Sequence, residues 1–323
     1  MTSLSQFPLL NHQTRKVQNS RLGGNVFGWT VIESDAFRLL DAAFDAGLTS
    51  IDTADIYPRW VPGNSGGESE AIIGKWLARS GKRDQVFLAT KAGMDMGGGK
   101  QGLAPRYIEE SLEASLRRLQ TDRVDLYQSH QDDPKTPLEE TLGAYERLIR
   151  QGKIRFIGAS NYSGARLRAA LETSRRNNLP RYQTLQPLYN LLEREPYESE
   201  LAPVAQEYGL GVIPYSSLAG GFLTGKYRTE SDLKGQARGA GVKKYLNPRG
   251  LAVLDTLRSV ASEYGATPAK VALAWLLARP GITAPIASAT NTLQLAELVE
   301  AANLSLRPDA VAKLTAASEP VAA

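Results

Sequence analysis

The sequence has 323 residues, of which 42% are hydrophobic and 22% charged, and a net charge of +4, a composition typical of a globular protein. The absence of cysteine excludes disulfides, cysteine nucleophiles and thiolate metal sites, and with only two histidines, His12 and His130, we expect no metal centre. Because the chain has no membrane-length apolar run, no export-signal pattern and only scattered basic residues, we expect a cytoplasmic protein that binds neither membrane nor nucleic acid.

Short apolar segments alternate with helix-patterned segments along almost the whole chain. Eight of these segments are candidate strands, at residues 25–27, 50–52, 86–91, 124–130, 154–158, 184–186, 211–214 and 282–286. They lack a strict alternation of polar and apolar residues, which is typical of parallel strands that are buried on both faces.

Helices are expected between these strands. Ser34 is a candidate N-cap for a helix that ends at Gly47, and the Thr-Pro-Leu-Glu sequence that starts at Thr136 has the pattern of a capping box. Thr267, followed by a proline, is expected to begin a further helix. The helical segments therefore separate successive strands, as crossover connections do.

Repeated strand–helix units predict a parallel sheet with right-handed crossovers, and eight of them in this length fit a (β/α)8 TIM barrel with outer helices. A doubly wound sheet is the alternative, but no G-x-G-x-x-G sequence follows the first strand. We predict one domain over residues 1–323, in which residues 1–23 form a hairpin that closes the barrel bottom. The active site is expected at the C-terminal ends of the strands, together with the loops at 93–102 and 216–248.

Four polar side chains stand at the ends of three neighbouring predicted strands. Asp52 ends the second strand and Tyr57 follows it closely, while Lys91 ends the third strand and His130 ends the fourth. Taken singly, each has an ordinary explanation as a cap, a surface residue, a packed aromatic or a core histidine. Their occurrence at consecutive strand ends indicates a shared site.

The four residue types favour one chemistry. A free tyrosine has a pKa near 10, and a neighbouring lysine stabilises its phenolate form. Asp52 can serve as the counter-ion of a buried Lys91, and the imidazole of His130 can donate a hydrogen bond to a carbonyl oxygen. Such a set can polarise a carbonyl group and protonate the alkoxide as it forms. Because the set contains no obvious nucleophile or metal, the electron pair is expected from a bound cofactor.

At these positions the sequence resembles a known family. Residues 52–57, Asp-Thr-Ala-Asp-Ile-Tyr, together with Lys91 and His130, resemble the catalytic tetrad of the aldo-keto reductase superfamily. Residues 158–162, 186–190 and 215–226 are similar to motifs that follow its fifth, sixth and seventh strands. The resemblance covers nearly the whole chain and is greatest to the bacterial aryl-alcohol-dehydrogenase-like branch and to potassium-channel β subunits.

The resemblance implies a role for each matching residue. Tyr57 is expected to be the general acid, tuned by Lys91 and Asp52, while His130 orients the substrate carbonyl. The expected cofactor-binding residues are Gly24, Asn25, Asp52, Ser160, Asn161, Gln186, Tyr215, Ser216, Leu218, Gly220, Lys226, Arg238, Ser288, Thr290, Gln294 and Glu297. Of these, Ser160, Asn161 and Gln186 would hold the nicotinamide carboxamide, and Tyr215 would stack on the ring. Lys226 would line the pyrophosphate with its neighbours, and Arg238 would clamp the adenosine side. The expected substrate pocket comprises Trp29, Tyr57, Trp60 and His130.

Two segments depart from the family pattern. Many relatives carry a basic residue, which grips the 2′-phosphate of NADP, where Thr290 or Asn291 stands here, and many carry asparagine in place of Leu298. We therefore expect NADP(H), with NAD(H) as the alternative. The segment 58–65 is longer than the usual glycine turn, and we expect its Trp60 to lie beside Trp29 or Tyr189.

The function expected from these observations is the NADP-dependent reduction of an aldehyde or ketone to the alcohol, or the reverse reaction. A cofactor-sensing regulatory subunit with slow turnover is the alternative from another class, and a barrel hydrolase or aldolase that uses Lys91 as a Schiff base is a third. The expected partner is a small carbonyl or alcohol substrate, whose identity, together with the reaction direction and the oligomeric state, the sequence leaves open.

Overall fold

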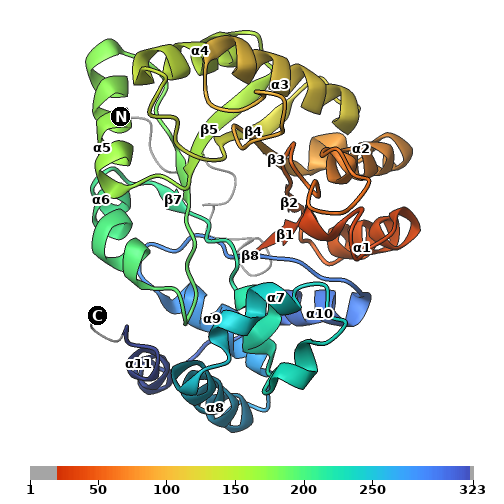
Figure 1. The fold of residues 1–323 in the computed structure, drawn as a ribbon, viewed down its shortest axis with the longest axis vertical. Coiled ribbons are helices and arrows are strands. Elements are labelled where there is room, and N and C mark those ends of the chain that lie inside the picture. Colours follow the sequence, from red (N-terminus) through yellow and green to blue (C-terminus); the bar gives the residue numbers. More distant parts are fainter. Residues whose placement is uncertain (1–19, 321–323) are drawn as a thin grey trace.

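The computed structural model describes residues 20–320, and its eight strands form one parallel sheet that curls around a central axis (Figure 1). The strands lie in the order β7-β6-β5-β4-β3-β2-β1-β8, so β1 to β7 follow one another in chain order and β8 pairs with β1. Their bounds are β1 (Arg21–Gly23), β2 (Ser50–Asp52), β3 (Phe87–Ala92), β4 (Val124–Ser129), β5 (Ile154–Ser160), β6 (Thr184–Gln186), β7 (Gly211–Val212) and β8 (Ile286–Ala287).

The ring closes between its last two strands. Val212 of β7 forms a parallel bridge with Ile282, and its carbonyl oxygen accepts a hydrogen bond from the backbone N–H of Thr283 at 2.8 Å. The backbone N–H of Ile286 then bonds to the carbonyl oxygen of Pro214 at 2.9 Å. The predicted (β/α)8 TIM barrel is therefore confirmed, with the strand predicted at 282–286 reduced to β8 and an isolated bridge before it.

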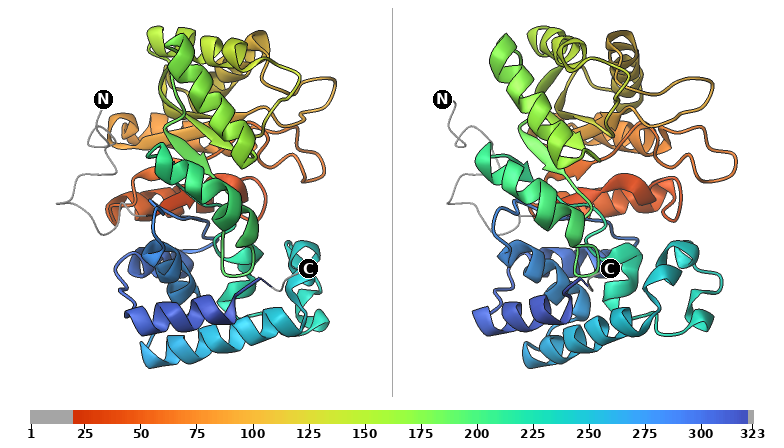
Figure 2. Two further views of the ribbon diagram at one scale, coloured as in Figure 1. Left: turned by 90° about the vertical axis from the view of Figure 1, so that its left-hand side faces the viewer. Right: turned by 60° about the vertical axis from the view of Figure 1, so that its left-hand side comes forward.

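Helices surround the sheet on its outer side (Figure 1). Those that complete strand–helix units are α1 (Glu33–Asp45), α2 (Glu68–Ser80), α3 (Pro105–Leu119), α4 (Leu138–Arg150), α5 (Gly164–Asn177), α6 (Ala202–Glu207), α9 (Pro268–Ala278) and α10 (Thr292–Ala301). Three further helices are α7 (Gly239–Val242), α8 (Pro248–Glu263) and α11 (Pro308–Ala317). Figure 2 shows that α8 to α11 pack together at one side of the barrel. Within residues 20–320, every helix is too short or too polar to span a membrane.

Two separate apolar regions hold the barrel together. The larger one lies between sheet and helices, where the amphipathic helices bury one face each, as in the case of Trp76 of α2 and Trp275 of α9. The smaller one fills the barrel interior with Ala89, Leu126, Ile213 and Ala284. Because strand side chains alternate between the two faces, the residues two positions further along these strands also face inward, at the end where the site is expected.

The first strand lies earlier in the chain than predicted. Residues 25–27 do not form a strand, because the 3-10 helix η3 (Gly24–Val26) turns the chain there with a hydrogen bond from Phe27 N–H to Gly24 carbonyl oxygen. Instead, residues 21–23 form β1, which pairs with β2 and β8. These three residues of the predicted N-terminal hairpin therefore belong to the barrel, and residues 1–19 of that prediction lie outside the described residues.

The predicted helix caps were only partly right. Thr267 caps α9 as predicted, since its side chain accepts a hydrogen bond from the backbone N–H of Lys270. Ser34 lies inside α1, one residue after the helix begins. Thr136 does not cap α4, because its hydroxyl instead donates to Asp133 at 2.7 Å. For Thr136 the Asp133 carboxylate thus competes with the backbone for the hydroxyl.

Two mid-helix glycines give a direct test of this packing. A Cβ added at Gly74 of α2 would lie 2.1 Å from the carbonyl oxygen of Arg118 in α3, whereas one at Gly143 of α4 would meet only the Arg147 side chain, at 3.9 Å. We expect Gly74→Ala to lower the free energy of unfolding by ~1–3 kcal/mol through overpacking. The matched variant Gly143→Ala should raise it by ~0.5–1 kcal/mol through helix propensity. Urea unfolding of both variants measures the difference, and equal effects would contradict the close crossing of α2 and α3.

Candidate active site

The four predicted catalytic side chains converge at the C-terminal end of the barrel. Asp52 is the last residue of β2, Lys91 lies near the end of β3 and His130 directly follows β4. Tyr57 lies in the loop after β2 and is half-buried, while the other three are buried. The parallel strands bring these chain-distant residues together because their C-terminal ends all open at the same face.

Lys91 is the centre of the group. Its ammonium donates hydrogen bonds to Asp52 Oδ1 at 2.5 Å, to the carbonyl oxygen of Thr53 at 2.8 Å and to Tyr57 Oη at 3.4 Å. Three N–H donors therefore meet three acceptors, as a fully buried lysine requires. Lys91 is thus an internal residue that joins the carboxylate to the phenol.

The second oxygen of Asp52 contacts two buried amides. Gln186 Nε2 donates to Asp52 Oδ2 at 3.0 Å and Gln128 Nε2 donates at 3.2 Å, while Gln186 Nε2 also lies 3.2 Å from Gln128 Oε1. Gln128 is a residue of this site that was not among the predicted site residues. Its position two residues before His130 on β4 was the available signal, since residues two apart on a strand share a face.

The electrostatics keep Tyr57 protonated at neutral pH. Burial raises the pKa of Tyr57, and the positive charge of Lys91 lowers it only in part. For Lys91, burial lowers the pKa, but Asp52 and Tyr57 together outweigh burial and the net shift is upward. Lys91 lowers the pKa of Tyr57 as expected, but burial outweighs this contribution and the net shift is upward. The phenol is therefore protonated at neutral pH and the lysine is a cation.

His130 faces Tyr57 as a neutral imidazole. The two ring centroids are 5.7 Å apart at an angle of 78°. Burial lowers the pKa of His130 well below its ordinary value, and the charge of Lys91 lowers it further. Its Nδ1 is buried and has no hydrogen-bond partner among the described residues. The ring is thus held in place by packing and by its backbone, whose N–H donates to the Ala92 carbonyl oxygen at 2.8 Å.

Two tryptophans extend the site outward from Tyr57. Trp60 lies edge-on to Tyr57 at 5.6 Å and to Trp29 at 5.5 Å, and it is 47% exposed. The guanidinium of Arg238 lies 5.3 Å from the Trp29 ring centroid. Tyr189, the other predicted neighbour of Trp60, is instead buried against Tyr197 and Trp275. These contacts build an aromatic wall, defined as Trp29 and Trp60, beside the phenol.

A row of polar side chains continues from the tetrad across β5 to β7. Ser160 Oγ donates to the carbonyl oxygen of Gln186 at 2.8 Å, and Asn161 Nδ2 donates to that of His130 at 2.8 Å. Tyr215 Oη in turn donates to Asn161 Oδ1 at 2.9 Å. Asn161 has a φ of 54°, a left-handed conformation that asparagine tolerates better than most residues. This polar row (Ser160, Asn161, Gln186 and Tyr215) is contiguous with Asp52 through Gln186.

The segment after β7 loops out over the same end of the barrel. Its first residue, Ser216, has a φ of 55°, and its carbonyl oxygen accepts a hydrogen bond from Asn190 Nδ2 at 3.0 Å. Leu218 precedes η6 (Ala219–Thr224), in which Gly220 has a φ of 67°. Lys226 follows with its ammonium 4.9 Å from the Tyr227 ring centroid and its side chain exposed.

The remaining predicted residues gather around the ends of β1 and β8. Ser288 Oγ donates to Asn25 Oδ1 at 2.6 Å, and both the backbone N–H and the hydroxyl of Thr290 donate to Gln294 Oε1. Gln294 lies in the first turn of α10, and Glu297 is half-buried one turn later. Gly24 packs against α2, where a Cβ would lie 2.9 Å from Ser69 Oγ. In residues 20–320, no group of three His, Asp or Glu side chains is arranged to hold a metal ion.

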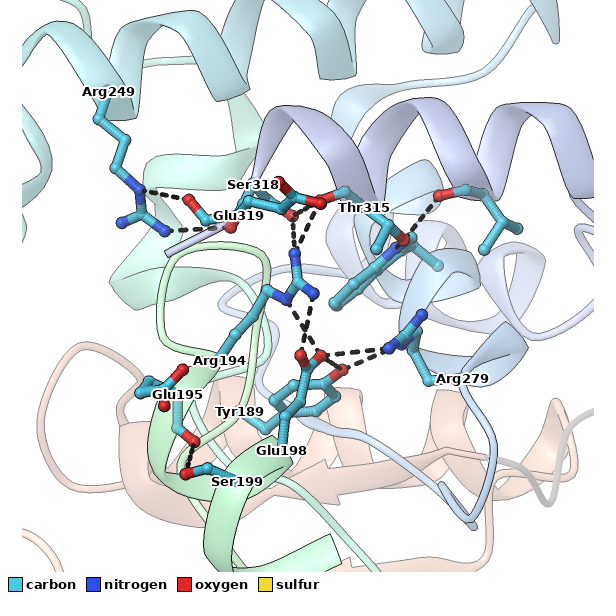
Figure 3. Close-up of polar contacts among 12 residues, drawn as sticks. Tyr189, Arg194, Glu195, Glu198, Ser199, Arg249, Arg279, Thr315, Ser318 and Glu319 are labelled. Carbon is cyan, nitrogen blue, oxygen red and sulfur yellow. Dashed lines mark hydrogen bonds and ion pairs between the residues drawn. The ribbon is translucent and has the colours of Figure 1, made fainter. Parts of the chain in front are cut away.

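A charged network joins the segment after β6 to the helices α9 and α11 (Figure 3). Glu198 accepts hydrogen bonds from Tyr189 Oη at 2.6 Å, from Arg194 at 2.9 and 3.0 Å, and from Arg279 at 3.2 Å. Arg194 also donates to the carbonyl oxygen of Thr315, at the end of α11, at 2.7 Å. The segment after β6 is thereby fixed to α9 and α11, which keeps the neighbouring Asn190–Ser216 contact in place.

Asp55 stands out as a buried acid with an incomplete environment. Its side chain is 3% exposed, and Oδ1 has no hydrogen-bond partner among residues 20–320. Burial, together with the charge of the nearby Glu70, raises its pKa to about 8, although the charge of Arg118 opposes the shift. Glu70 takes the hydrogen bonds of Arg118 and of Thr90 for itself. Asp55 is therefore protonated at neutral pH, two residues before Tyr57.

Comparisons with known proteins match this chain over nearly its full length. The model of the aldo/keto reductase family matches residues 21–319. "Uncharacterized oxidoreductase YrpG" of Bacillus subtilis is 37% identical over 309 residues, 93% of this chain and 92% of that protein. "Aldo-keto reductase YhdN" of the same organism is 37% identical, and the match covers 89% of this chain and 84% of that protein. "Putative voltage-gated potassium channel subunit beta" of Schizosaccharomyces pombe is 32% identical, covering 95% and 92%.

The pKa of Asp55 predicts a pH-dependent stability. The pKa of Asp55 is near 8 in the folded chain and about 4 in the unfolded chain. The folded chain therefore binds this proton more tightly, and the resulting contribution to the free energy of unfolding is complete below pH 4 and is lost as the pH rises to 8. Asp55→Asn removes this loss, so the variant should match the wild type near pH 4 and exceed it increasingly up to pH 8. Each pKa unit is worth about 1.4 kcal/mol, so the gain at pH 8 should reach several kcal/mol. Urea unfolding at pH 4, 6 and 8 measures it, and a constant difference would contradict the raised pKa.

Proposed function

Since this chain belongs to the aldo/keto reductase family, we propose that it is an NADP-dependent oxidoreductase that reduces an aldehyde or ketone to the alcohol, or catalyses the reverse. Family membership makes it an NAD(P)-dependent oxidoreductase in general terms. The observation that carries the finer proposal is the hydrogen-bonded series Asp52–Lys91–Tyr57, which ends at a phenol beside an aromatic wall.

Tyr57 is the proposed general acid. Its raised pKa keeps it protonated at neutral pH, so it carries a proton for the alkoxide that forms as the carbonyl is reduced. The ammonium of Lys91, 3.4 Å from the phenol oxygen, stabilises the phenolate that remains. Asp52 holds Lys91 in that position and keeps it charged. In the oxidation direction the same phenolate accepts the proton.

His130 and the aromatic wall are proposed to place the substrate. The neutral imidazole can donate a hydrogen bond to the substrate carbonyl, which polarises it without adding a charge beside Lys91. Trp29 and Trp60 cover the side of Tyr57 with apolar surface, which favours an aromatic or apolar group next to the reacting carbon. The proposed substrates are therefore small carbonyl compounds or the matching alcohols.

The polar row supports a nicotinamide site next to Tyr57. The Nε2 group of Gln186 is engaged by Asp52 and Gln128, which leaves Gln186 Oε1 available as an acceptor for a carboxamide N–H. Ser160 and Asn161 add donors and acceptors, and the ring of Tyr215 offers a stacking surface. A reduced nicotinamide bound there supplies the hydride.

The outlying residues support the rest of an NADP site. The backbone around Ser216, Leu218 and Gly220, with the exposed cation of Lys226, suits a pyrophosphate. Asn25, Ser288, Thr290, Gln294 and Glu297 are proposed to surround the adenosine end, close to Gly24. Arg238 is the remaining proposed cofactor contact. Because its guanidinium lies over Trp29, this cation is also near the aromatic wall.

A second candidate function is a cofactor-sensing regulatory subunit, because one relative is named as a potassium channel β subunit. The two functions differ in turnover. A reductase should reduce a generic aromatic aldehyde such as 4-nitrobenzaldehyde at the rate of an ordinary enzyme, about 1 to 10³ per second, whereas a sensor should turn over far more slowly with equally tight cofactor binding.

Tyr57→Phe tests the proposed acid. The variant keeps the ring and its contacts but loses the transferable proton, so NADPH affinity should stay unchanged while kcat for aldehyde reduction falls by ~10²- to 10⁴-fold. Stopped-flow absorbance at 340 nm measures the turnover, and fluorescence titration measures the affinity. If turnover of the variant stayed within a factor of about three of wild type, which is far less than the expected loss, the general acid would be another group.

Cofactor choice tests the adenosine end. Thr290 offers a single hydroxyl and a backbone N–H, both engaged by Gln294, and Glu297 adds no positive charge, so NADPH should be preferred only moderately and NADH should remain usable. Thr290→Arg should tighten NADPH binding by ~1.5–3 kcal/mol at most, the value of a charged hydrogen bond, and leave NADH unaffected. Isothermal titration of both cofactors measures this. Tighter binding of NADH by the wild type would make NAD the cofactor.

A further inference from the structure

Arg21 is a second buried cation in the barrel, and the proposed reaction does not use it. It begins β1, its side chain is fully buried, and its guanidinium lies 4.9 Å from the ring centroid of Phe87 on β3. Phe87 packs against the cluster in the barrel interior, whereas Leu22 belongs to the core outside the barrel. Since neighbouring strand residues point to opposite faces, Arg21 points inward.

The strand register places Arg21 below Asp52. Gly23 of β1 pairs with Asp52 of β2, and Arg21 is two residues earlier on the same inward face. Glycine at position 23 leaves no side chain between them, and a Cβ there would lie 2.6 Å from Ser288 Oγ. The guanidinium and the carboxylate therefore face each other through the barrel interior.

Asp52 provides the opposing charge for this cation. The guanidinium nitrogens have no hydrogen-bond partner among residues 20–320, and burial lowers the pKa of Arg21 to about 10 while the Asp52 carboxylate raises it. Arg21 is still charged at neutral pH. A buried cation without direct partners is unfavourable for folding, so its presence here calls for an explanation in the site above it.

The buried charges explain what Arg21 does. Lys91 and Asp52 alone form a neutral pair, whereas Arg21 adds a positive charge on the side of Asp52 that faces away from Tyr57. With this second cation the three buried charges carry a net positive charge, which favours the phenolate form of Tyr57. We propose that Arg21 is a positioning residue, whose charge offsets that of Asp52 so that the charge of Lys91 acts more fully on Tyr57. This proposal rests on the proposed function, in which Tyr57 transfers the proton.

Other charged and titratable groups also face Tyr57 and define what the test must hold constant. They are Lys91 from β3, Asp52 and Asp55 from β2 and its loop, neutral His130 after β4, Tyr215 after β7 and Arg238 from the 216–248 segment. The described contact of the Arg21 side chain is with Phe87 and not with Tyr57, so a substitution at position 21 changes the charge behind Asp52 and the packing on Phe87 without replacing any group that faces Tyr57.

The experiment is the pH dependence of alcohol oxidation by Arg21→Met, with benzyl alcohol and NADP⁺ as probes. Oxidation needs the phenolate, so turnover rises with pH as Tyr57 loses its proton. Without Arg21, the negative charge of Asp52 offsets more of the positive charge of Lys91, and the pKa of Tyr57 rises. The rising limb, which is the part of the pH profile where turnover increases, should therefore shift to higher pH by about one unit. Turnover at a given pH on this limb should then be about tenfold lower. NADP⁺ affinity, measured by fluorescence titration, should stay unchanged, and Arg21→Lys, which keeps the charge, should restore the wild-type limb.

A matched control separates charge from stability. Arg83 lies outside the barrel, where it donates to Asp125 at 3.0 Å, so Arg83→Met also removes an arginine from a carboxylate. It should lower the melting temperature without moving the limb. Arg21→Gln serves as a second variant if Arg21→Met does not fold. A limb that coincides with wild type in a folded position-21 variant would overturn the proposal for Arg21. A limb that persists in Tyr57→Phe would instead overturn the assignment of Tyr57.

Discussion

The ion pair between Lys91 and Asp52 is the interaction on which the rest of this site depends. Both groups are buried, and a charge in such an environment is tolerated only when it is paired and its remaining donors and acceptors are satisfied. Lys91 meets this condition through Thr53 and Tyr57, and Asp52 meets it through Gln128 and Gln186. The orientation of the phenol and that of the polar row both follow from satisfying this one pair.

The barrel can hold such a pair because apolar contacts fill much of its interior. Ala89, Leu126, Ile213 and Ala284 pack there, with Arg21 as the charged residue next to this cluster through Phe87. The polar layer then lies at the open end, where loops add the aromatic wall on one side and the 216–248 segment on the other. The Glu198 network stiffens that end by joining the segment after β6 to α9 and α11 (Figure 3).

Several buried groups in and below the site are poorly satisfied. Arg21, Asp55 and His130 each have at least one buried polar atom without a partner among residues 20–320, as do Ser50 and Thr184 at the starts of β2 and β6. Asp55 and His130 lie beside Tyr57, whereas Arg21 lies below Asp52. Such groups reduce folding stability, and the two beside Tyr57 fit the pattern expected where function competes with stability.

The sequence by itself determined the fold class and predicted the candidate catalytic set, because both leave local patterns in the chain. Parallel strands leave apolar segments at regular intervals, and Asp52, Lys91 and His130 each follow such a segment directly. Only the tertiary structure decided which residues complete the set. Gln128 and Arg21 contact or face Asp52 from other strands. The position of Gln128 before His130 hints at a shared face, but its bond to Asp52 and the place of Arg21 follow only from the strand register. It also moved β1 from residues 25–27 to 21–23 and placed Trp60 beside Trp29 rather than Tyr189. Register and side-chain packing depend on contacts between distant segments, and these arise only when the barrel closes.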